Sequence, residues 1–240
     1  MNRFICNAAL AAGLLACAGL ASAHDGDRDF DRNHDDDCAL SAQVIASVQS
    51  KLAVVVTQSN GGIFAPNRMW SAVVDRQGRL CSVIKVGDAW PGSRAIAIAK
   101  ANTANAFSND GLSLSTANLY AATQPGGSLY GLNNSNPFNP DFLPQGTGIG
   151  KVPGGIITFG GGVPLYYGGK VIGGVGVSGD SACADHVIAY RMRRLAHLDV
   201  IPGGVGFNGT DNIAFPPAGA APSGFQHPHC FPNDLSPGAI

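Results

Sequence analysis

The segment GGGVPLYYGGKVIGGVGVSGDSACAD, residues 160–185, carries the strongest structural pattern of the chain. Its apolar runs, residues 163–167 and 170–177, are separated by Gly168 and Gly169. Two glycines between alternating apolar runs favour a tight β-hairpin, because the turns of such hairpins need positive φ angles. The Ser-Gly-Asp-Ser sequence of residues 178–181 then predicts the start of a helix.

The second half of this segment has two possible interpretations. Gly173, Gly174 and Gly176 lie inside an expected strand, where glycine usually marks the close approach of a ligand or of another backbone. Residues 178–181 would present the backbone N–H groups of a helix N-terminus, which suit a carboxylate or a phosphate. The alternative is a tightly packed hairpin and a capped helix without a ligand. The spacing of these residues favours neither interpretation over the other.

The N-terminal residues have the pattern of an export signal. Arg3 is followed by an apolar run at residues 8–20 and by Ala-Ser-Ala at residues 21–23. We therefore expect a signal peptide at residues 1–23 and a periplasmic or secreted protein. The alternative is a lipoprotein anchored at Cys17. The apolar run is too short to predict a membrane span.

Charge is distributed unevenly. Residues 24–38 hold seven Asp and two Arg, which predicts a disordered acidic linker. All sixteen acidic residues of the chain are Asp, so mechanisms that use glutamate are excluded. The sequence contains no basic tract of the kind that binds nucleic acid, and we expect no nucleic-acid partner.

Four cysteines remain once the signal peptide is removed, and they allow three disulfide pairings. No Cys-x-x-Cys occurs, which argues against a redox dithiol or a zinc ribbon. We expect Cys183 to pair with Cys230, because the Pro/Gly-rich tail at residues 200–240 shows no hydrophobic stripe that could dock it. Cys38 would then pair with Cys81.

The remaining patterns predict an α+β fold, with an antiparallel sheet that carries helices on one or both faces. Ser41 and Ser93 are expected to cap the first and second helices. A polar segment, residues 108–155, is expected to form a long insert loop with a short helix at 115–123. The expected helices are residues 40–58, 93–107 and 181–198, and the expected strands of the first hairpin are residues 69–74 and 79–86.

Lys100 lies on an otherwise apolar stripe of the second helix, together with Ile96, Thr103 and Phe107. A lysine in that position must extend to solvent, pair with an acid or meet an anionic ligand. Convergence of Lys100, Thr103 and Ser178 on a pocket of carboxylate size would suggest an enzyme of small organic acids. We predict that the Lys100 ammonium is unpaired or faces a ligand. The alternative is a salt bridge from Lys100 to Asp75 or Asp185.

Histidines supply the candidate metal ligands. His227 and His229 alternate around Pro228, so both imidazoles could face one side of an extended segment and hold a metal. The alternative is a loop tethered through Cys230 with two solvent-facing histidines. His186 is interpreted as a helix-surface residue that could share a ligand face with Tyr190.

Several blocks, in order along the chain, resemble the GlcG/HbpS-like haem-binding and haem-degrading family, which is related to the PduO C-terminal domain. The resemblance implies a GlcG/HbpS-like domain at residues 39–199, a profilin-like α+β fold, assembly into a homo-oligomer and haem as the cofactor. The blocks are AVVDRQGRL at residues 72–80, AIAKANTA at 97–104, GGVPL at 161–165 and VIGGVGVSG at 171–179, with Asp185 after them.

On these grounds the chain is expected to be an exported haem-binding protein that stores, carries or slowly degrades haem; haem degradation is implied by the resemblance alone. The alternatives are an enzyme that binds small organic acids and a ligand-free accessory oligomer. The candidate haem-iron ligands are His227, His229 and His186. The candidate ligand-binding residues are Lys100, Thr103, Gly161, Gly162, Ser178, Gly179 and Asp185, which we call the Lys100 cluster.

Overall fold

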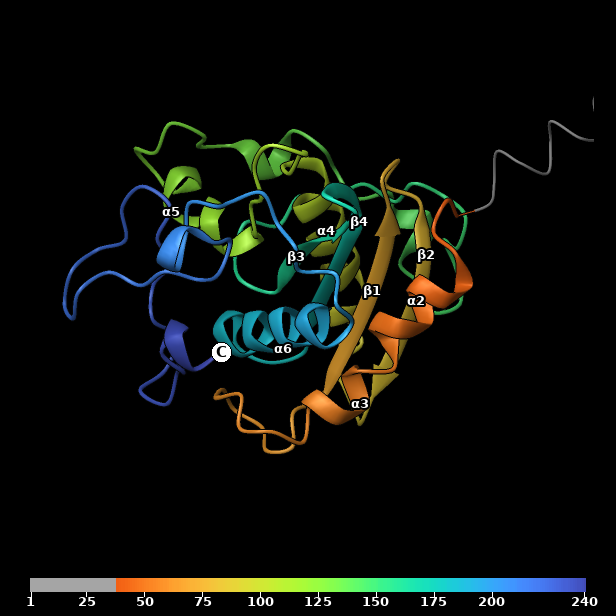
Figure 1. Ribbon diagram of the computed structural model, residues 1–240, viewed down its shortest axis with the longest axis horizontal. Helices are drawn as coiled ribbons and strands as arrows, with labels where there is room; N and C mark the ends of the chain where they lie inside the picture. Colours follow the sequence, from red (N-terminus) through yellow and green to blue (C-terminus); the bar gives the residue numbers. More distant parts are fainter. Residues whose placement is uncertain (1–37) are drawn as a thin grey trace, which may run out of the picture. The chain divides into compact units, whose positions relative to one another are not determined.

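The structure is a computed structural model that describes residues 38–240 (Figure 1). The expected signal peptide, Cys17 and residues 24–37 of the expected linker lie outside these residues. Across the described part of the chain, no helix is both long enough and apolar enough to cross a membrane.

The hairpin expected from the Gly-Gly sequence forms. Strand β3 (Gly162–Tyr167) pairs antiparallel with β4 (Lys170–Ser178). Gly168 and Gly169 make the turn with φ angles of 59° and 77°. Two successive positive φ angles are those of a type I′ turn, and glycine adopts them without a steric cost.

The first hairpin is also confirmed. Strand β1 (Met69–Asp75) pairs antiparallel with β2 (Leu80–Val86), and β1 pairs antiparallel with β4 on its other side. The Asp75 carboxylate closes the turn by accepting hydrogen bonds from the N–H groups of Gln77 and Arg79, both at 2.9 Å. The result is one antiparallel sheet with the order β2-β1-β4-β3.

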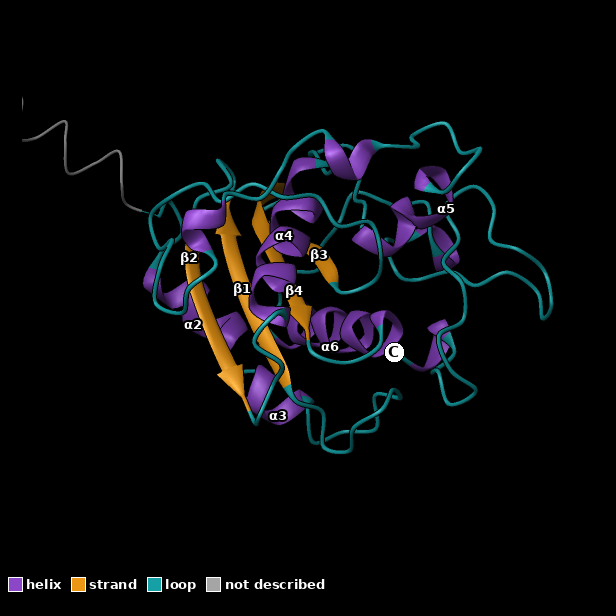
Figure 2. Ribbon diagram, turned by 180° about the vertical axis from the view of Figure 1, so that it is seen from behind, coloured by secondary structure: helices purple, strands orange, loops and turns teal. Residues whose placement is uncertain are grey.

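Helices cover both faces of this sheet (Figures 1 and 2). Helix α4 (Ser93–Ala106) packs on one face, where Ala97, Ile98 and Ala101 meet Ala72 and Val74 of β1. Helices α2 (Ala42–Gln49), α3 (Leu52–Val55) and α6 (Ala182–Leu195) pack on the other face. The expected α+β fold, an antiparallel sheet flanked by helices, is therefore confirmed.

The helix ends differ from the expectations in three places. The expected helix at 40–58 is interrupted at Ser50 and Lys51, which separate α2 from α3. Ser93 is the first residue of α4 and caps nothing; Gly92 is the N-cap. Helix α6 ends at Leu195, because His197 takes a left-handed φ of 57° and the Leu198 N–H bonds back to the Arg193 carbonyl.

The glycines inside β4 face protein backbone. A Cβ added at Gly176 would lie 2.0 Å from the Ala97 carbonyl oxygen, and one at Gly174 would lie 2.3 Å from that of Ala101. The backbone of α4 therefore rests directly on β4. The structure therefore supports the interpretation that these glycines allow the close approach of another backbone.

The small residues of α4 take part in its packing against the sheet of the same chain. Ala97, Ala99, Ala101 and Ala104 are all buried. Their small size therefore serves packing within the chain and gives no support to a homo-oligomer. The homo-oligomer stays a prediction that rests on the family resemblance.

Substitution of Gly176 tests this contact. We expect Gly176→Ala to lower the free energy of unfolding by about 1–3 kcal/mol, because the new methyl group forces α4 away from β4. Urea unfolding of the full chain measures the loss. Gly92→Ala is the control, since a Cβ there meets nothing within 4 Å. Equal stability of the two variants would contradict direct contact between α4 and β4.

The insert contains the expected short helix, as a 3₁₀ turn η1 (Thr116–Leu119) that continues into α5 (Tyr120–Thr123). Further on, the insert has two more 3₁₀ turns, η2 (Leu132–Asn134) and η3 (Pro140–Phe142). In the part of the tail after Ile201, only the 3₁₀ turns η4 (Phe207–Gly209) and η5 (Pro237–Ala239) are regular.

Both expected disulfides form. Cys38 pairs with Cys81 at a Cα–Cα distance of 5.3 Å, and Cys183 pairs with Cys230 at 6.0 Å. The premise that the tail has no apolar docking surface was wrong, however. Ile213 packs in an apolar cluster with Val187 of α6, so the disulfide supplements a hydrophobic contact.

Candidate functional site

Lys100 does not face a ligand. Its Nζ atom lies 2.7 Å from Asp185 Oδ2 and donates a second hydrogen bond, at 3.1 Å, to the Val177 carbonyl. It also lies 4.8 Å from the centre of the Phe159 ring. The Lys100 and Asp185 side chains are 0% and 2% exposed. The alternative of a salt bridge to Asp185 is therefore correct, and the prediction of a ligand-facing ammonium was wrong.

Glycine makes room for this ion pair. Lys100 comes from α4 and Asp185 from α6, helices that cover opposite faces of the sheet, and they meet beside the start of β3. A Cβ on Gly161 would lie 2.7 Å from Lys100 Nζ, and one on Gly162 would lie 2.4 Å from the Lys100 carbonyl oxygen. These two glycines of the Lys100 cluster therefore serve the packing between the helices and β3.

Burial sets the charge state of the pair. Desolvation lowers the pKa of Lys100, although the neighbouring Asp185 opposes this effect. Desolvation raises the pKa of Asp185 to about 6, and Lys100 opposes it. Asp185 is therefore still mainly ionised at neutral pH, and the contact is an ion pair.

Other members of the Lys100 cluster also bond within the protein. The Thr103 hydroxyl donates to the Ala99 carbonyl at 2.7 Å and accepts the Ile157 N–H at 2.9 Å. Ser178 is buried, and a Cβ on Gly179 would lie 2.0 Å from the Arg68 carbonyl oxygen. The expected carboxylate pocket between Lys100, Thr103 and Ser178 is therefore not formed.

Protein groups also occupy the N-terminus of α6. The Ser181 hydroxyl accepts the Ala184 N–H at 3.2 Å, and Cys230 Sγ accepts the Cys183 N–H at 3.2 Å. The Asp180 carboxylate accepts the N–H groups of Ile63 and Ser181. These contacts support the interpretation of this helix start as a capped N-terminus without an anionic ligand.

The histidines of the tail do not face one side. His227 is buried, and its Nε2 accepts the Gly160 N–H at 3.2 Å while its Nδ1 lies 2.7 Å from the Pro228 carbonyl oxygen. His227 is therefore neutral, with its proton on Nδ1. The His229 side chain is 53% exposed and stacks on Phe215 at 4.1 Å. Both ring nitrogens of His227 are therefore used within the protein, and the expected metal site shared by His227 and His229 is not formed.

His186 is interior as well, and its interpretation as a helix-surface residue was wrong. Its Nε2 accepts the Ile213 N–H at 3.0 Å and lies 3.1 Å from Asn212 Oδ1. Desolvation lowers the pKa of His186 to about 3. Of the three candidate iron ligands, only His229 therefore exposes its imidazole.

His227 makes folding sensitive to acid. Desolvation lowers its pKa from 6.5 to about 4, so between these values the unfolded chain binds a proton that the folded chain does not. Stability is lost as the pH falls through this window, by up to about 1.4 kcal/mol per pH unit. In urea unfolding, we expect the stability of wild type relative to His227→Gln to fall by about 3 kcal/mol from pH 6.5 to pH 4.

The matched control is His229→Gln, which changes an exposed histidine two residues away. Because His229→Gln keeps His227, its stability should still fall as the pH drops from 6.5 to 4. Parallel pH profiles for wild type and His227→Gln would contradict a buried, neutral His227.

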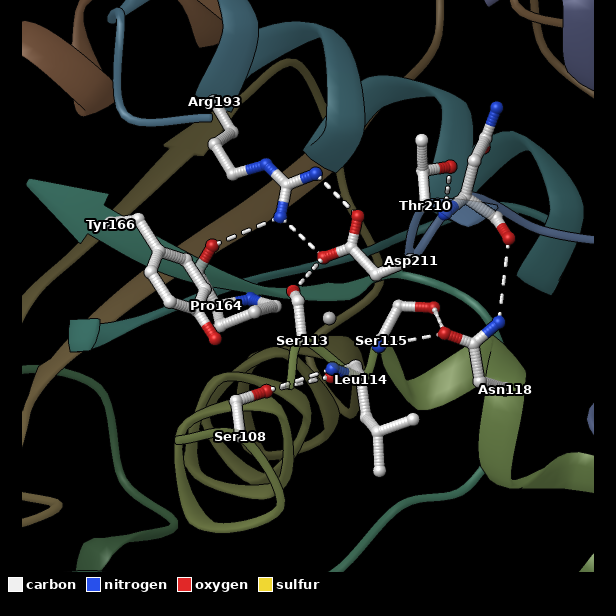
Figure 3. Close-up of polar contacts among 12 residues, drawn as sticks. Ser108, Ser113, Leu114, Ser115, Asn118, Pro164, Tyr166, Arg193, Thr210 and Asp211 are labelled. Atoms are coloured by element: carbon white, nitrogen blue, oxygen red, sulfur yellow. Dashed lines mark hydrogen bonds and ion pairs between the residues drawn. The ribbon is translucent and has the colours of Figure 1, made fainter. Parts of the chain in front are cut away.

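A second buried ion pair was missed by the sequence analysis. Figure 3 shows Arg193 of α6 facing Asp211 of the tail. Two parallel contacts, Nη1–Oδ2 at 2.5 Å and Nη2–Oδ1 at 2.7 Å, join the two side chains, and the Ser113 hydroxyl donates to Asp211 at 2.6 Å. Arg193 also donates to the Pro164 carbonyl of β3 at 3.1 Å. These contacts connect α6, β3, the insert and the tail.

The sequence did contain a signal for this pair. Asp211 and Asp234 are the two acids in the apolar, Pro/Gly-rich residues 200–240. An isolated acid in such surroundings needs a cationic partner once it is buried. Arg193, near the end of α6, is buried and supplies that partner.

A cleft of about 500 Å³ opens where α3, the segment at residues 63–68 and the end of β2 meet, and we call it the α3 cleft. Its walls are mainly apolar, with the Arg68 side chain among them. The lining contains no histidine, cysteine, methionine or tyrosine. The lining includes Val56, Ile63, Phe64, Pro66, Arg68 and Val86.

An exposed apolar side chain, Ile63, lines this cleft, and the exposed Trp90 ring lies beside it in contact with the half-buried lining residue Phe64. Phe64 and Trp90 make an edge-to-face contact at 5.8 Å, and the Arg68 guanidinium lies 4.9 Å from the centre of the Phe64 ring. Ile63 is 56% exposed and Trp90 is 51% exposed. The α3 cleft can therefore offer a flat or apolar molecule both an aromatic surface and a positive charge. The sequence analysis did not predict this site.

Comparison with known proteins identifies the family. A family model described as haem degrading protein, HbpS-like, matches residues 65–193, which is more than half of the 240 residues. The chain belongs to the HbpS-like family. The match confirms the resemblance that the sequence blocks indicated.

Relatives of this HbpS-like chain include two proteins of Citrobacter freundii. An uncharacterized 15.0 kDa protein encoded in the dhaT-dhaS intergenic region is 36% identical over 118 residues, which are 49% of this chain and 68% of that protein. The corrinoid adenosyltransferase PduO is 33% identical over 118 residues, which are 49% of this chain but 29% of PduO. The likeness to PduO therefore covers less than a third of that enzyme.

A solved structure related to this HbpS-like chain contains haem. The crystal structure of a PduOC–haem complex matches 65% of this chain and 94% of that chain, with a TM-score of 0.50 and 28% sequence identity.

Proposed function

We propose that this protein binds haem. The observation that carries the proposal is its membership of the HbpS-like family, whose model is described as haem degrading. The 28% identity to PduOC, which has been crystallised as a haem complex, supports it. When bound, haem supplies an iron centre for redox or oxygen chemistry.

The α3 cleft fits such a ligand. Its volume of about 500 Å³ lies within the range of about 300–1,000 Å³ that is usual for small-molecule sites. The apolar walls and the Arg68 guanidinium of the cleft, with the exposed Trp90 ring beside its Phe64 wall, match a flat apolar macrocycle with two propionates. By contrast, no observation favours the organic-acid enzyme, because Lys100 and Thr103 bond to the protein itself.

We further propose that the protein is exported and that it stores, carries or slowly degrades haem as a homo-oligomer. Two disulfides suit an oxidising compartment, which supports export. The storage, transport and degradation roles rest on the family resemblance.

A haem titration of the purified full chain tests the central proposal. We expect a shifted and sharpened Soret band that saturates at micromolar haem. Saturation should raise the melting temperature, because a ligand that binds only the folded state stabilises it. An unchanged Soret band and an unchanged melting temperature would leave the ligand-free accessory oligomer as the better account.

A further inference from the structure

Among the described cavities, the α3 cleft has the volume and the lining residues that suit a porphyrin best. We infer, on the basis of the proposed haem binding, that this cleft holds haem by its porphyrin face and its propionates, while no cleft side chain ligates the iron. The inference rests on the cleft's apolar walls, on the Phe64 ring in its lining with the exposed Trp90 ring beside it, on its single cation and on the residue types that its lining lacks.

The walls supply the apolar contact. Val56 of α3 and Val86 of β2 lie on two sides, and Ile63, Phe64 and Pro66 come from the segment between α3 and β1. Ile63 is 56% exposed, a large fraction for an isoleucine in a folded chain. Val56 is already buried, so a flat ligand would cover mainly Ile63 and Pro66, with the half-buried Phe64 and Val86 beside them. Removal of this apolar surface from water is the dominant favourable term in such binding.

Two aromatic rings give the surface its preference for a flat π-system. Trp90 is 51% exposed, and Phe64 meets it edge to face at 5.8 Å. The Trp90 backbone is held by a hydrogen bond of 3.0 Å from Trp70 Nε1 to its carbonyl oxygen, so the position of the ring rests on a fixed backbone. Aromatic contacts of this kind contribute beyond simple burial of area.

Arg68 supplies the charge. Its guanidinium lies over the Phe64 ring at 4.9 Å, and it makes no hydrogen bond or ion pair to any residue at positions 38–240. A guanidinium can receive a carboxylate through two parallel hydrogen bonds. The two propionates of haem are anionic at neutral pH, so Arg68 provides the complementary group at the edge of the apolar surface.

Three other described cavities fit less well. A cavity of about 250 Å³ between α4 and the insert is apolar but has no charged side chain in its lining. A cavity of about 310 Å³ beside Arg191 and Arg194 offers charge, but both guanidiniums already bond to backbone carbonyls. A further cavity, of about 400 Å³, has Arg76 in its lining, but that guanidinium bonds to the Asn105 and Ser108 carbonyls and Asp110 lies in the same lining. The α3 cleft alone among these four combines apolar walls with a cation free of hydrogen bonds.

The residue types in the lining also allow a prediction about the role of the iron in binding. Haem iron is normally held by histidine, cysteine, methionine or tyrosine, and none of these lines the α3 cleft. Binding should therefore depend on the porphyrin and not on the metal. We expect metal-free protoporphyrin IX to bind within about three-fold of haem, and its dimethyl ester, which has lost both carboxylates, to bind more weakly by about five-fold.

Two cleft variants and two matched controls test the site. In protoporphyrin titrations followed by porphyrin fluorescence, we expect Trp90→Ala to weaken binding about ten-fold and Arg68→Gln about five-fold. Tyr167→Ala and Lys170→Gln, which change an exposed aromatic and an exposed lysine of the β3–β4 hairpin, should bind like wild type. Melting temperatures of all four variants should stay near that of wild type.

The outcomes separate the inference from the proposed function. If haem binds to wild type and equally to Trp90→Ala and Arg68→Gln, the α3 cleft is overturned as the site and haem binding stands. If haem binds but protoporphyrin does not, iron ligation carries the affinity and the inference is overturned. If wild type binds neither, the proposed function and the inference fail together.

Discussion

Lys100→Met is expected to destabilise the protein by about 3–5 kcal/mol, because it leaves the Asp185 carboxylate buried without its cation. Urea unfolding of the full chain at pH 7 measures the loss. The expectation reverses the role that the sequence suggested for Lys100, in which the same substitution would weaken ligand binding and leave the melting temperature nearly unchanged.

A second variant and a pH series sharpen this test. Asp185→Asn keeps an acceptor for the Asp180 N–H but carries no charge, so the double variant Lys100→Met/Asp185→Asn should be more stable than Lys100→Met. The loss in Lys100→Met should also shrink as the pH falls toward 6, because Asp185 without its cation takes up a proton at a higher pH than the value of about 6 in wild type. Lys170→Met, at an exposed turn, is the control, with an expected change within about 0.5 kcal/mol. A stable Lys100→Met protein would refute the structural role.

Arg193→Met is expected to cost a similar amount, about 3–5 kcal/mol, and to release the tail. The substitution leaves Asp211 buried with the Ser113 hydroxyl as its remaining side-chain partner. Hydrogen exchange should therefore speed up at residues 211–213 as well as in α6. Arg193→Lys should lose less stability than Arg193→Met, because lysine keeps the charge but not the two parallel contacts.

The neighbouring Arg194→Met provides the control. Arg194 is exposed and bonds to the Ile240 carbonyl, so its loss should cost about 1 kcal/mol or less. If Arg193→Met and Arg194→Met are equally stable, the Arg193–Asp211 pair does not hold the tail.

Local patterns predicted the local structure well. The Gly168-Gly169 turn, the strands on both sides of it and the caps at Ser41 and Ser181 all follow from rules about a few adjacent residues. The disulfide pairing was also correct, although the tail that it fastens has an apolar contact of its own. Ser93 shows the limit of such rules, since Gly92 caps α4 in its place.

These local patterns could not predict which residues far apart in the sequence contact each other. The stripe that carries Lys100 showed that it needed a partner, but the choice between Asp75, Asp185 and a ligand depends on how α4 and α6 meet at β3. The strand glycines likewise showed close approach without showing what approached. The α3 cleft combines Val56, Arg68 and Val86 from three elements, and no local pattern joins them.

A crystal structure of the full chain with bound haem tests the central claim most directly. We predict density for the macrocycle in the α3 cleft, against Phe64 and Trp90, with Arg68 at a propionate. The Lys100–Asp185 ion pair should remain closed in that structure. Haem bound at the start of α6, with Lys100 drawn away from Asp185 toward a propionate, would contradict the account.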